Sequence, residues 1–277
     1  MSGSLAVSII TPVFNAGAAL EQAFASVGAQ SFSDWEHVVV DDGSTDDTTR
    51  RILDAASSRP KVTVLRGENG GPARARNRAL AHARGRYVLP LDADDYLHAT
   101  FLARTVPVLE AEPQTGIVHT WVGLVGGHVG VWKTGPATIP ALLARCTLHV
   151  TSLFRRELWD PADGFDPSFV ETGEDWDFWI RLAARGVEAR AVPEVLAYYR
   201  RTPGSRDDAA RGPARADAVM RRLLAKHGAL YAAHAPDVVA ALFVEVTQLG
   251  KSLQRVYANP LVRLALRART VLGKGRS

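Results

Sequence analysis

The chain has 277 residues, of which 47% are hydrophobic and 22% are charged, a balance that suits one large α/β domain with or without an appendage and excludes a wholly disordered protein. Its single cysteine, Cys146, excludes an intramolecular disulfide. The net charge of +4 is uneven, because residues 1–199 sum to −6 and residues 200–277 to +10. Since the positive charge is confined to the last quarter and no nucleic-acid-binding module accompanies it, we expect no nucleic-acid partner.

The hydropathy pattern predicts a protein that does not cross a membrane. No uncharged run reaches the roughly 18 apolar residues that a spanning helix requires. The apolar segment 7–13 is too short for a signal peptide and carries Ser8, Thr11 and Pro12. We therefore expect a cytoplasmic location.

The first 100 residues alternate between strand-like and helix-like segments. Four β-then-α repeats of this length predict an α/β fold with a mostly parallel central sheet, flanked by helices and joined by right-handed crossovers. Ser44 or Thr45 is expected to cap the second helix. The predicted strands cover residues 7–11, 36–40, 62–65 and 87–91, and the predicted helices cover residues 18–30, 46–57 and 72–84.

The rest of the chain divides into a less regular middle and a helical end. Gly, Pro, Ser, Arg and Asp dominate residues 202–215, which predicts a flexible loop, and helical segments broken at Pro236 and Pro260 follow it. Strands are predicted at 116–125, 129–132 and 194–201, and a helix at 173–185. The expected domains are 1–201, with halves 1–98 and 99–201, then the loop 202–215 and a basic helical extension, 216–277.

Polar residues follow three of the predicted strands, at 11–15, 41–44 and 92–95. In open α/β sheets, ligands bind outside the carboxyl ends of the strands. The three clusters therefore predict one shared site.

Acids dominate two of these clusters. The carboxylates of Asp92, Asp94 and Asp95 suit a Mg²⁺ or Mn²⁺ ion that also holds phosphate oxygens, and the alternative is a solvated turn in which an Asp caps a helix. Asp41 and Asp42 precede a Gly-Ser-Thr sequence that is typical of a turn and a helix cap. A carboxylate at the mouth of a buried strand can also accept the N3–H of a uracil-type ring.

Five segments, in the right order and spacing, resemble the family 2 glycosyltransferases with the GT-A fold. The resemblance covers about residues 5–201 and implies a Rossmann-like GT-A domain with a helical C-terminal extension. It also implies inverting transfer of a sugar from a nucleotide-sugar donor, with a UDP-sugar expected and Mn²⁺ or Mg²⁺ as cofactor. The implied acceptor is a hydroxyl on a glycan, a lipid-linked molecule or a small molecule, in polysaccharide or cell-envelope biosynthesis. The segments are VSIITPVFN (7–15), DDGST (41–45), ARN (75–77), LDADD (91–95) and GEDWDFW (173–179).

The resemblance implies roles for individual residues at the donor. Asp42 matches the acid that contacts the base, Asp92 the acid near the ribose, and Asp94 the metal ligand of a D-x-D motif. Phe14 stands where the family usually has Tyr, which keeps a stacking face and loses a hydroxyl. The expected donor-binding residues are Pro12, Phe14, Asn15, Asp42, Arg76 and Asp92.

The segment 173–179 is expected to carry the catalytic base. Asp175 matches the family's general base, whereas Glu174 is either the base itself or a charge that tunes Asp175. Trp176 is a candidate for holding an acceptor sugar ring, with core packing as its alternative, and core packing is favoured for Trp179.

Three further candidates come from other parts of the chain. His149 is a candidate metal or phosphate ligand, and a buried structural imidazole is the alternative. Arg201 and Ser205 lie where the family often has a flexible loop that closes over the diphosphate.

The tail from Lys251 to the end has seven Lys and Arg residues and no acid. Leu261, Leu264, Ala265 and Leu272 give it an apolar stripe, so contact with an anionic membrane at the cytoplasmic face is one prediction. The alternatives are a helix packed on the catalytic domain and a dimer contact.

Two other functions compete with glycosyl transfer. A nucleotidyltransferase also uses a nucleotide, a metal and carboxylates, but it is expected to carry a Gly-rich phosphate loop where this chain has PVFN at 12–15. A degenerate module that binds a sugar nucleotide or a glycan without catalysis is the second alternative. The presence of Asp94 and Asp175 argues against it.

Overall fold

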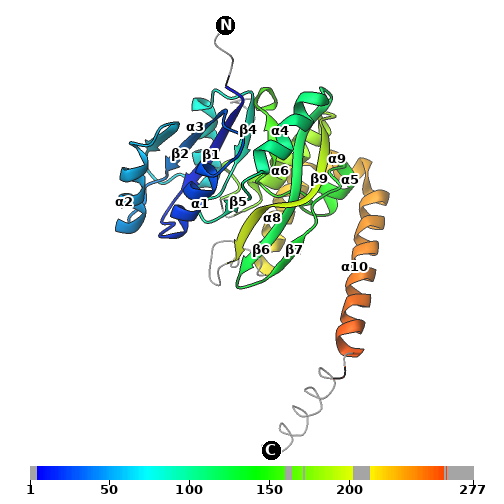
Figure 1. Cartoon of the computed structure of the whole chain (residues 1–277). Coiled ribbons are helices and arrows are strands. Elements are labelled where there is room, and N and C mark those ends of the chain that lie inside the picture. The colour runs from blue at the N-terminus through cyan, green and yellow to red at the C-terminus, as the bar shows by residue number, and fades with distance from the viewer. Residues whose placement is uncertain (1–4, 160–163, 171, 202–212, 259, 261–277) are drawn as a thin grey trace, which may run out of the picture. The chain divides into compact units, whose positions relative to one another are not determined.

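The computed structural model describes residues 5–159, 164–170, 172–201, 213–258 and 260 (Figure 1). Across these residues, nine strands form one sheet in the order β3-β2-β1-β4-β8-β6-β9-β5, and β7 pairs with β6. The strands are β1 (Val7–Val13), β2 (Trp35–Asp41), β3 (Val62–Arg66), β4 (Tyr87–Pro90), β5 (Tyr96–Leu97), β6 (Thr115–Gly126), β7 (Gly130–Trp132), β8 (Leu153–Arg155) and β9 (Glu188–Arg201). The helices are α1 (Ala19–Gly28), α2 (Asp47–Ala56), α3 (Pro72–His82), α4 (Phe101–Ala111), α5 (Ile139–Ala144), α6 (Glu174–Ala184), α8 (Pro213–Lys226), α9 (Gly228–Ala233) and α10 (Ala235–Ala258), with a 3-10 turn η1 (Arg156–Leu158).

The first half of the sheet is parallel, as predicted. Strand β1 pairs in parallel with both β2 and β4, and β2 pairs in parallel with β3. Nearly continuous buried runs such as Val38–Val40 are typical of parallel strands that helices cover on both faces.

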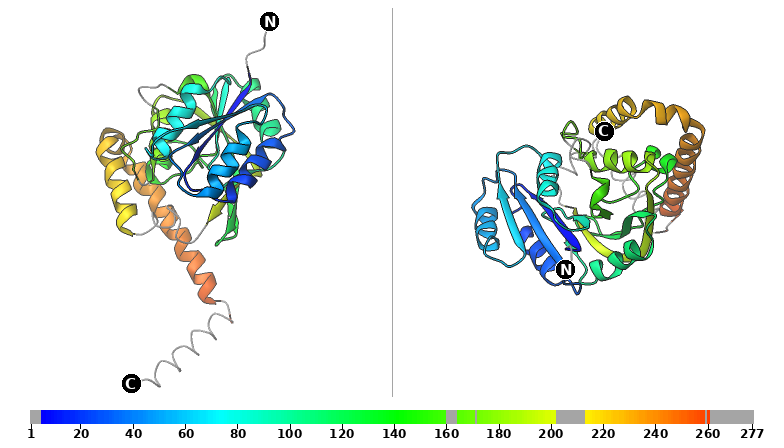
Figure 2. Two further views of the ribbon diagram at one scale, coloured as in Figure 1. Left: turned by 90° about the vertical axis from the view of Figure 1, so that its left-hand side faces the viewer. Right: turned by 90° about the horizontal axis from the view of Figure 1, so that it is seen from above.

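Helices lie on both faces of this half. From α1 and α2, Leu20, Phe24 and Leu53 pack with Val13 and Val39 on one face. Helix α3 contacts β1 and β2 on the opposite face, where it leads into the site (Figure 2).

The cap of α2 differs from the prediction. Neither Ser44 nor Thr45 caps this helix, because the carboxylate of Asp46 accepts the N–H of Thr49 at 2.8 Å. The carboxylate reaches the third residue of the first turn, whereas the hydroxyl of Ser44 accepts the N–H of Asn15.

The second half of the sheet is mixed. Strand β6 pairs antiparallel with β7 and β8 and parallel with β9, which begins at Glu188 rather than at residue 194. The early part of β9 is mostly exposed and contains Pro193, features that weaken a strand signal in a sequence. Its pairing with β6 is a long-range contact that the sequence pattern does not reveal.

The C-terminal part contains helices, as predicted, but α8 begins at Pro213, before residue 216. The rest of the predicted loop, 202–212, lies outside the described residues. The chain forms two compact units, of which the first ends at Gly228 and the second begins at Ala229, so α8 belongs with the first. Helix α9 ends at Ala233 and α10 begins at Ala235, so the break predicted at Pro236 is present and the proline lies in the first turn after it. In the described part of the chain, every helix is too short or too polar to cross a bilayer.

Candidate active site

Strand register brings the three predicted polar clusters to one edge of the sheet. Asp41 lies opposite Val13, and the N–H of Asp42 donates to the carbonyl of Val13 at 2.8 Å. The N–H of Leu91 donates to the carbonyl of Ile10 at 2.9 Å, so the acids after β4 begin at this same edge. The shared location predicted from the sequence is confirmed.

The carboxylate of Asp42 ties the end of β2 to the loop before α3. One oxygen accepts the N–H of Gly70 and the other that of Gly71, both at 2.8 Å. Gly43 permits this close approach, because its φ is +79° and an added Cβ would lie 2.9 Å from the backbone nitrogen of Asn69. Each carboxylate oxygen keeps a second lone pair for a donor such as a base N–H.

Asn15 and Phe14 have different roles at the end of β1. The side-chain oxygen of Asn15 accepts the N–H groups of Thr45 at 2.7 Å and Asp46 at 3.2 Å, so it holds the loop that follows Asp42. Phe14 is 51% exposed and offers its ring to a ligand. Pro12, two residues earlier, lies within β1 and is half-buried.

Arg76 from α3 links the two halves of the site. Its buried guanidinium donates to Asp92 at 2.5 Å and to Glu174 at 2.6 Å, and it lies over the ring of Phe165. The nearby acids outweigh its burial and raise the pKa of Arg76, so it stays cationic. The next residue, Asn77, exchanges two hydrogen bonds with the backbone of Phe165, so its role is structural.

Asp95 belongs to the acidic cluster that the sequence predicted as a metal site, but its deep burial was not predicted. It is 1% exposed, and one carboxylate oxygen accepts the N–H of Arg200 at 2.8 Å. Its Oδ2 has no hydrogen-bond partner among the described residues. Burial and the charges of Asp94 and Asp92 hold the pKa of Asp95 well above its usual value.

This crowding of acids fits a divalent cation. Three carboxylates within four residues repel one another, and an ion at Asp94 would relieve that repulsion. The described part of the chain holds no group of three or more His, Cys, Asp or Glu side chains that could bind a metal unaided. A cation here would need ligands from a substrate, as Mg²⁺ commonly does with phosphates.

His149 lies behind the acids. It precedes β8 by four residues and is 7% exposed, and its Nδ1 accepts the N–H of Thr151 at 3.2 Å. The other ring nitrogen is 3.9 Å from Asp95 Oδ2. Burial lowers the pKa of His149 to about 4, so the imidazole is neutral near pH 7.

The expected base stands at the start of α6. Gly173 precedes it with a φ of +95°, and an added Cβ would lie 2.9 Å from Val219 of α8. Asp175 is half-buried and one of its oxygens accepts the N–H of Trp176 at 2.8 Å. Desolvation, followed by the neighbouring charge of Glu174, raises the pKa of Asp175 to about 7.

The two tryptophans of α6 differ. Trp179 is fully buried and packs against Phe154 and Phe178, which confirms the expected core role. Trp176 is half-buried, and its indole N–H donates to the carbonyl of Leu142 at 2.5 Å, so the ring is fixed in place near Asp175.

The end of β9 reaches the acidic turn through Arg200. Its backbone N–H binds Asp95, and its Nε donates to the carbonyl of Asp94 at 3.0 Å. Arg201 is the last residue of β9, and its carbonyl accepts the N–H of Gly127 at 2.7 Å. Ser205, the other candidate here, lies outside the described residues.

Comparison with known proteins identifies the family. Residues 8–141 match the family model described as Glycosyl transferase family 2. The chain belongs to the family 2 glycosyltransferases.

Among curated relatives of this glycosyltransferase, the O-antigen biosynthesis protein RfbC of Myxococcus xanthus is 33% identical over 213 residues, covering 74% of this chain and 16% of RfbC. The poly(ribitol-phosphate) beta-N-acetylglucosaminyltransferase TarS of Staphylococcus aureus is 27% identical over 199 residues, covering 69% of this chain and 35% of TarS. The chain thus spans 35% or less of the length of these two relatives.

Solved structures confirm the GT-A fold of this family 2 glycosyltransferase. The structure of S. aureus TarS residues 1–349 in complex with UDP-GlcNAc superposes with a TM-score of 0.63 at 20% identity, covering 86% of this chain and 79% of that one. The mannosyltransferase PcManGT of Pyrobaculum calidifontis, in complex with GDP-Man and Mn²⁺, gives a TM-score of 0.59 at 22% identity and covers 95% of this chain and 83% of its own.

A buried acid of α6 also anchors α8 to this glycosyltransferase domain, and the sequence analysis missed it. Asp177 is fully buried and accepts from Arg181 at 2.8 Å, from Lys226 at 2.9 Å and from His227 at 2.8 Å. Burial acts to raise the pKa of Asp177, but these donors outweigh it, so the pKa lies below its usual value. The adjacent Lys226 and His227 at the end of a helical pattern were the available signal.

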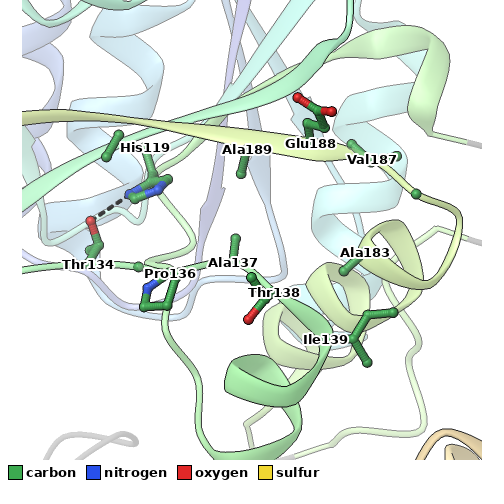
Figure 3. Close-up of a pocket in the computed structure, with 13 residues that line it drawn as sticks. His119, Thr134, Pro136, Ala137, Thr138, Ile139, Ala183, Val187, Glu188 and Ala189 are labelled. Carbon is green, nitrogen blue, oxygen red and sulfur yellow. Dashed lines mark hydrogen bonds between the residues drawn. The ribbon is translucent and has the colours of Figure 1, made fainter. Parts of the chain in front are cut away.

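The domain of this glycosyltransferase also has a cavity of about 550 Å³ at the C-terminal end of α6, the end away from Asp175 (Figure 3). Its lining is mostly apolar, and within it His119 hydrogen-bonds Thr134 at 2.7 Å. None of the candidate residues named above lines it. The cavity is formed by His119, residues 134–139, Ala183, residues 186–189 and Ala191.

Proposed function

We propose that this glycosyltransferase transfers one sugar from a nucleotide-sugar donor to an acceptor hydroxyl, with inversion at the anomeric carbon. The observation that carries the proposal is the buried Arg76, which connects Asp92 at the donor edge to Glu174, the neighbour of the base Asp175. These two ion pairs support a site in which donor-binding acids and a proton acceptor lie on either side of one cation.

The donor nucleotide would lie along the edge formed by β1, β2 and β4. The exposed ring of Phe14 supplies a stacking face for the base, and Pro12 lies beside it in β1. The carboxylate of Asp42 has lone pairs for the base N3–H, while Asp92 is the acid for the ribose. Asn15 acts by holding the loop after Asp42. TarS structures with UDP and UDP-GlcNAc favour a UDP-sugar here, and PcManGT with GDP-Man keeps a guanosine donor as the alternative.

The diphosphate would be bound beside Asp94 with Mn²⁺ or Mg²⁺ as cofactor. When bound, the cation supplies Lewis-acid stabilisation of the charge that develops on the leaving diphosphate. The Mn²⁺ in the PcManGT structure supports this cofactor class. Asp95 and the neutral His149 lie behind Asp94 and are proposed to fix its turn, with His149 as a further candidate ligand. Arg201, with Ser205, is proposed to close over the diphosphate.

The acceptor hydroxyl would lose its proton to Asp175. A carboxyl whose pKa is about 7 is partly ionised at neutral pH and accepts a proton with more driving force than an ordinary carboxylate. Glu174 is the weaker candidate, because one of its oxygens is held by Arg76 at 2.6 Å. Attack from the face opposite the diphosphate inverts the anomeric centre.

The acceptor is proposed to be a glycan, a lipid-linked molecule or a small hydroxyl compound, placed against the fixed ring of Trp176. RfbC is named as an O-antigen biosynthesis protein and TarS as a poly(ribitol-phosphate) beta-N-acetylglucosaminyltransferase. Both names support a role in cell-envelope polysaccharide biosynthesis. For a lipid-linked acceptor, a cytoplasmic enzyme would meet its substrate at the membrane surface through its basic end.

The decisive experiment separates donor binding from transfer. Thermal unfolding is measured with UDP, GDP, dTDP and CDP, each with and without Mn²⁺, for the wild type and for Asp175→Asn. At 100 times its Kd, the bound nucleotide should stabilise the fold by about 2.7 kcal/mol, and the variant should keep that shift. Transfer by the variant should fall by about 10²–10⁴-fold.

Asp54→Asn is the matched control, because Asp54 is an exposed acid of α2 and should lose neither binding nor transfer. Near-wild-type transfer by Asp175→Asn would show that the base is elsewhere. A wild type that binds a nucleotide but transfers no sugar would favour the non-catalytic binding module.

A further inference from the structure

Helix α10 carries a regular row of exposed apolar side chains. Their steps along the helix alternate between three and four residues, from 239 to 256. The helix is 24 residues long, or about 36 Å, so the row extends over most of its length. The row comprises Val239 (64% exposed), Leu242 (42%), Val246 (67%), Leu249 (58%), Leu253 (56%) and Val256 (53%).

Strict alternation of three and four is the pattern of a coiled-coil seam. A row spaced by 3.5 residues on average stays aligned with a second, supercoiled helix. Two further exposed apolar side chains, Phe243 (72%) and Tyr257 (56%), lie at the edge of the row. In heptad terms, the first positions hold Val239, Val246 and Leu253, and the fourth positions hold Leu242, Leu249 and Val256. The first two of these repeats have a β-branched Val at the first position and Leu at the fourth, which favours two-stranded pairing, and the third repeat has the reverse order.

We propose that α10 binds α10 of a second copy of this chain through this seam, which makes the glycosyltransferase a dimer. An identical helix offers the same spacing and the same side chains, so the surface is complementary to itself. The inference concerns α10 alone and does not depend on the proposed donor or acceptor.

The charges of α10 support a protein partner over an anionic membrane. The helix has two acids, Asp237 and Glu245, and two bases, Lys251 and Arg255, so its net charge is zero. All four lie off the seam. Helices that bind anionic lipid surfaces carry an excess of Lys and Arg on the polar face, and α10 has none.

The test measures the mass of the full-length protein in solution. Because the seam spans fewer than three heptads, we expect a weak dimer. Sedimentation is therefore measured over a wide range of protein concentration, from about 1 µM to about 200 µM. The wild type should be dimeric at the upper concentrations. Leu249→Glu buries a charge in the centre of the seam and should leave only monomer over the whole range.

Val244→Glu is the matched control. Val244 lies on the same helix, is 54% exposed and is outside the seam, so its variant should dimerise like the wild type. Circular dichroism of both variants, and their stabilisation by nucleotide, should equal those of the wild type, which separates lost pairing from lost folding.

Three results would overturn the proposal. They are a wild type that is monomeric at every concentration, a Leu249→Glu variant that still dimerises, and a Val244→Glu variant that dissociates equally. Pelleting of a monomeric wild type with vesicles of anionic phospholipid would assign the seam to a membrane instead.

Discussion

The guanidinium of Arg76 is buried between two carboxylates, and its positive charge offsets theirs within the site. Asp92 follows β4 and Glu174 begins α6, so the two acids come from different halves of the domain. Because the guanidinium keeps its proton, it offsets both charges without titrating. Asp175, one residue beyond Glu174, has a pKa raised to about 7, so its ionisation can change near neutral pH.

The titration of Asp175 predicts the pH dependence of transfer. A base must be deprotonated, and desolvation together with the Glu174 charge raises the pKa of Asp175 to about 7. Therefore kcat/KM should rise about tenfold per pH unit below that value and level off above it. Initial rates at subsaturating donor, from acid to alkaline pH, measure this profile.

Glu174→Gln tests the cause of the shift. Removing the neighbouring negative charge should move the rising part of the profile toward lower pH, by on the order of one unit. An unmoved profile would show that Glu174 does not raise the pKa of Asp175. Complete loss of transfer, with donor binding retained, would make Glu174 the base.

Sequence patterns predicted the residue types of the site better than their hydrogen bonds. Acids after β2 and β4 were expected, and the structure places them at one edge. The two N–H groups that bind Asp42 come from Gly70 and Gly71, about 28 residues away, and no local pattern reveals such a contact. The burial of Asp95 was not predicted for a similar reason, because the N–H that its carboxylate accepts comes from Arg200, 105 positions later.

Elements whose bounds follow from local sequence patterns were predicted more accurately than elements whose bounds depend on pairing with distant residues. The strands and helices of the first 100 residues follow hydrophobic runs and turn residues, and their bounds agree closely with the structure. The start of β9 and the placement of α8 depend on contacts with β6 and α6, respectively. Periodicity reports which face of an element is apolar, but not which element covers it.

The anchoring of α8 on α6 through Asp177 gives a stability prediction. Asp177→Asn removes a charge that Arg181, Lys226 and His227 all contact. Lys226, 31% exposed, can recover some hydration, whereas His227 is buried. We expect a loss of about 2–3 kcal/mol at pH 7, measured by urea unfolding. Asp217→Asn is the control, since its pair with Arg221 on α8 is exposed and should contribute nothing measurable.

The same residue predicts an acid dependence. The folded pKa of Asp177 lies below its usual value of 3.8, so its contribution is present above that pH and is lost as the pH falls through the folded pKa. The stability difference between the wild type and Asp177→Asn should therefore shrink in strong acid. An equal difference at neutral pH and in strong acid would show that the carboxylate charge is not the cause.

At the scale of the whole molecule, charge and structure divide the chain at different places. Net positive charge begins near residue 200, but the first compact unit continues to Gly228 and includes α8. Composition alone therefore assigned α8 to the extension, although Leu223 is fully buried and Lys226 binds Asp177. The described residues of the candidate site all belong to this first unit.

Two truncations test that division. A chain that lacks residues 229–277 should keep its fold and its nucleotide-dependent stabilisation, because it retains α8 and the described candidate residues. A chain that lacks residues 213–277 should lose about 1.5–3 kcal/mol from the burial of Leu223, and more from the exposure of Asp177 to water without Lys226 and His227. Thermal unfolding with and without UDP and Mn²⁺ measures both. If the two truncated chains were equally stable, α8 would be dispensable for the domain. If the chain that lacks only residues 229–277 failed to fold, the division at Gly228 would be wrong.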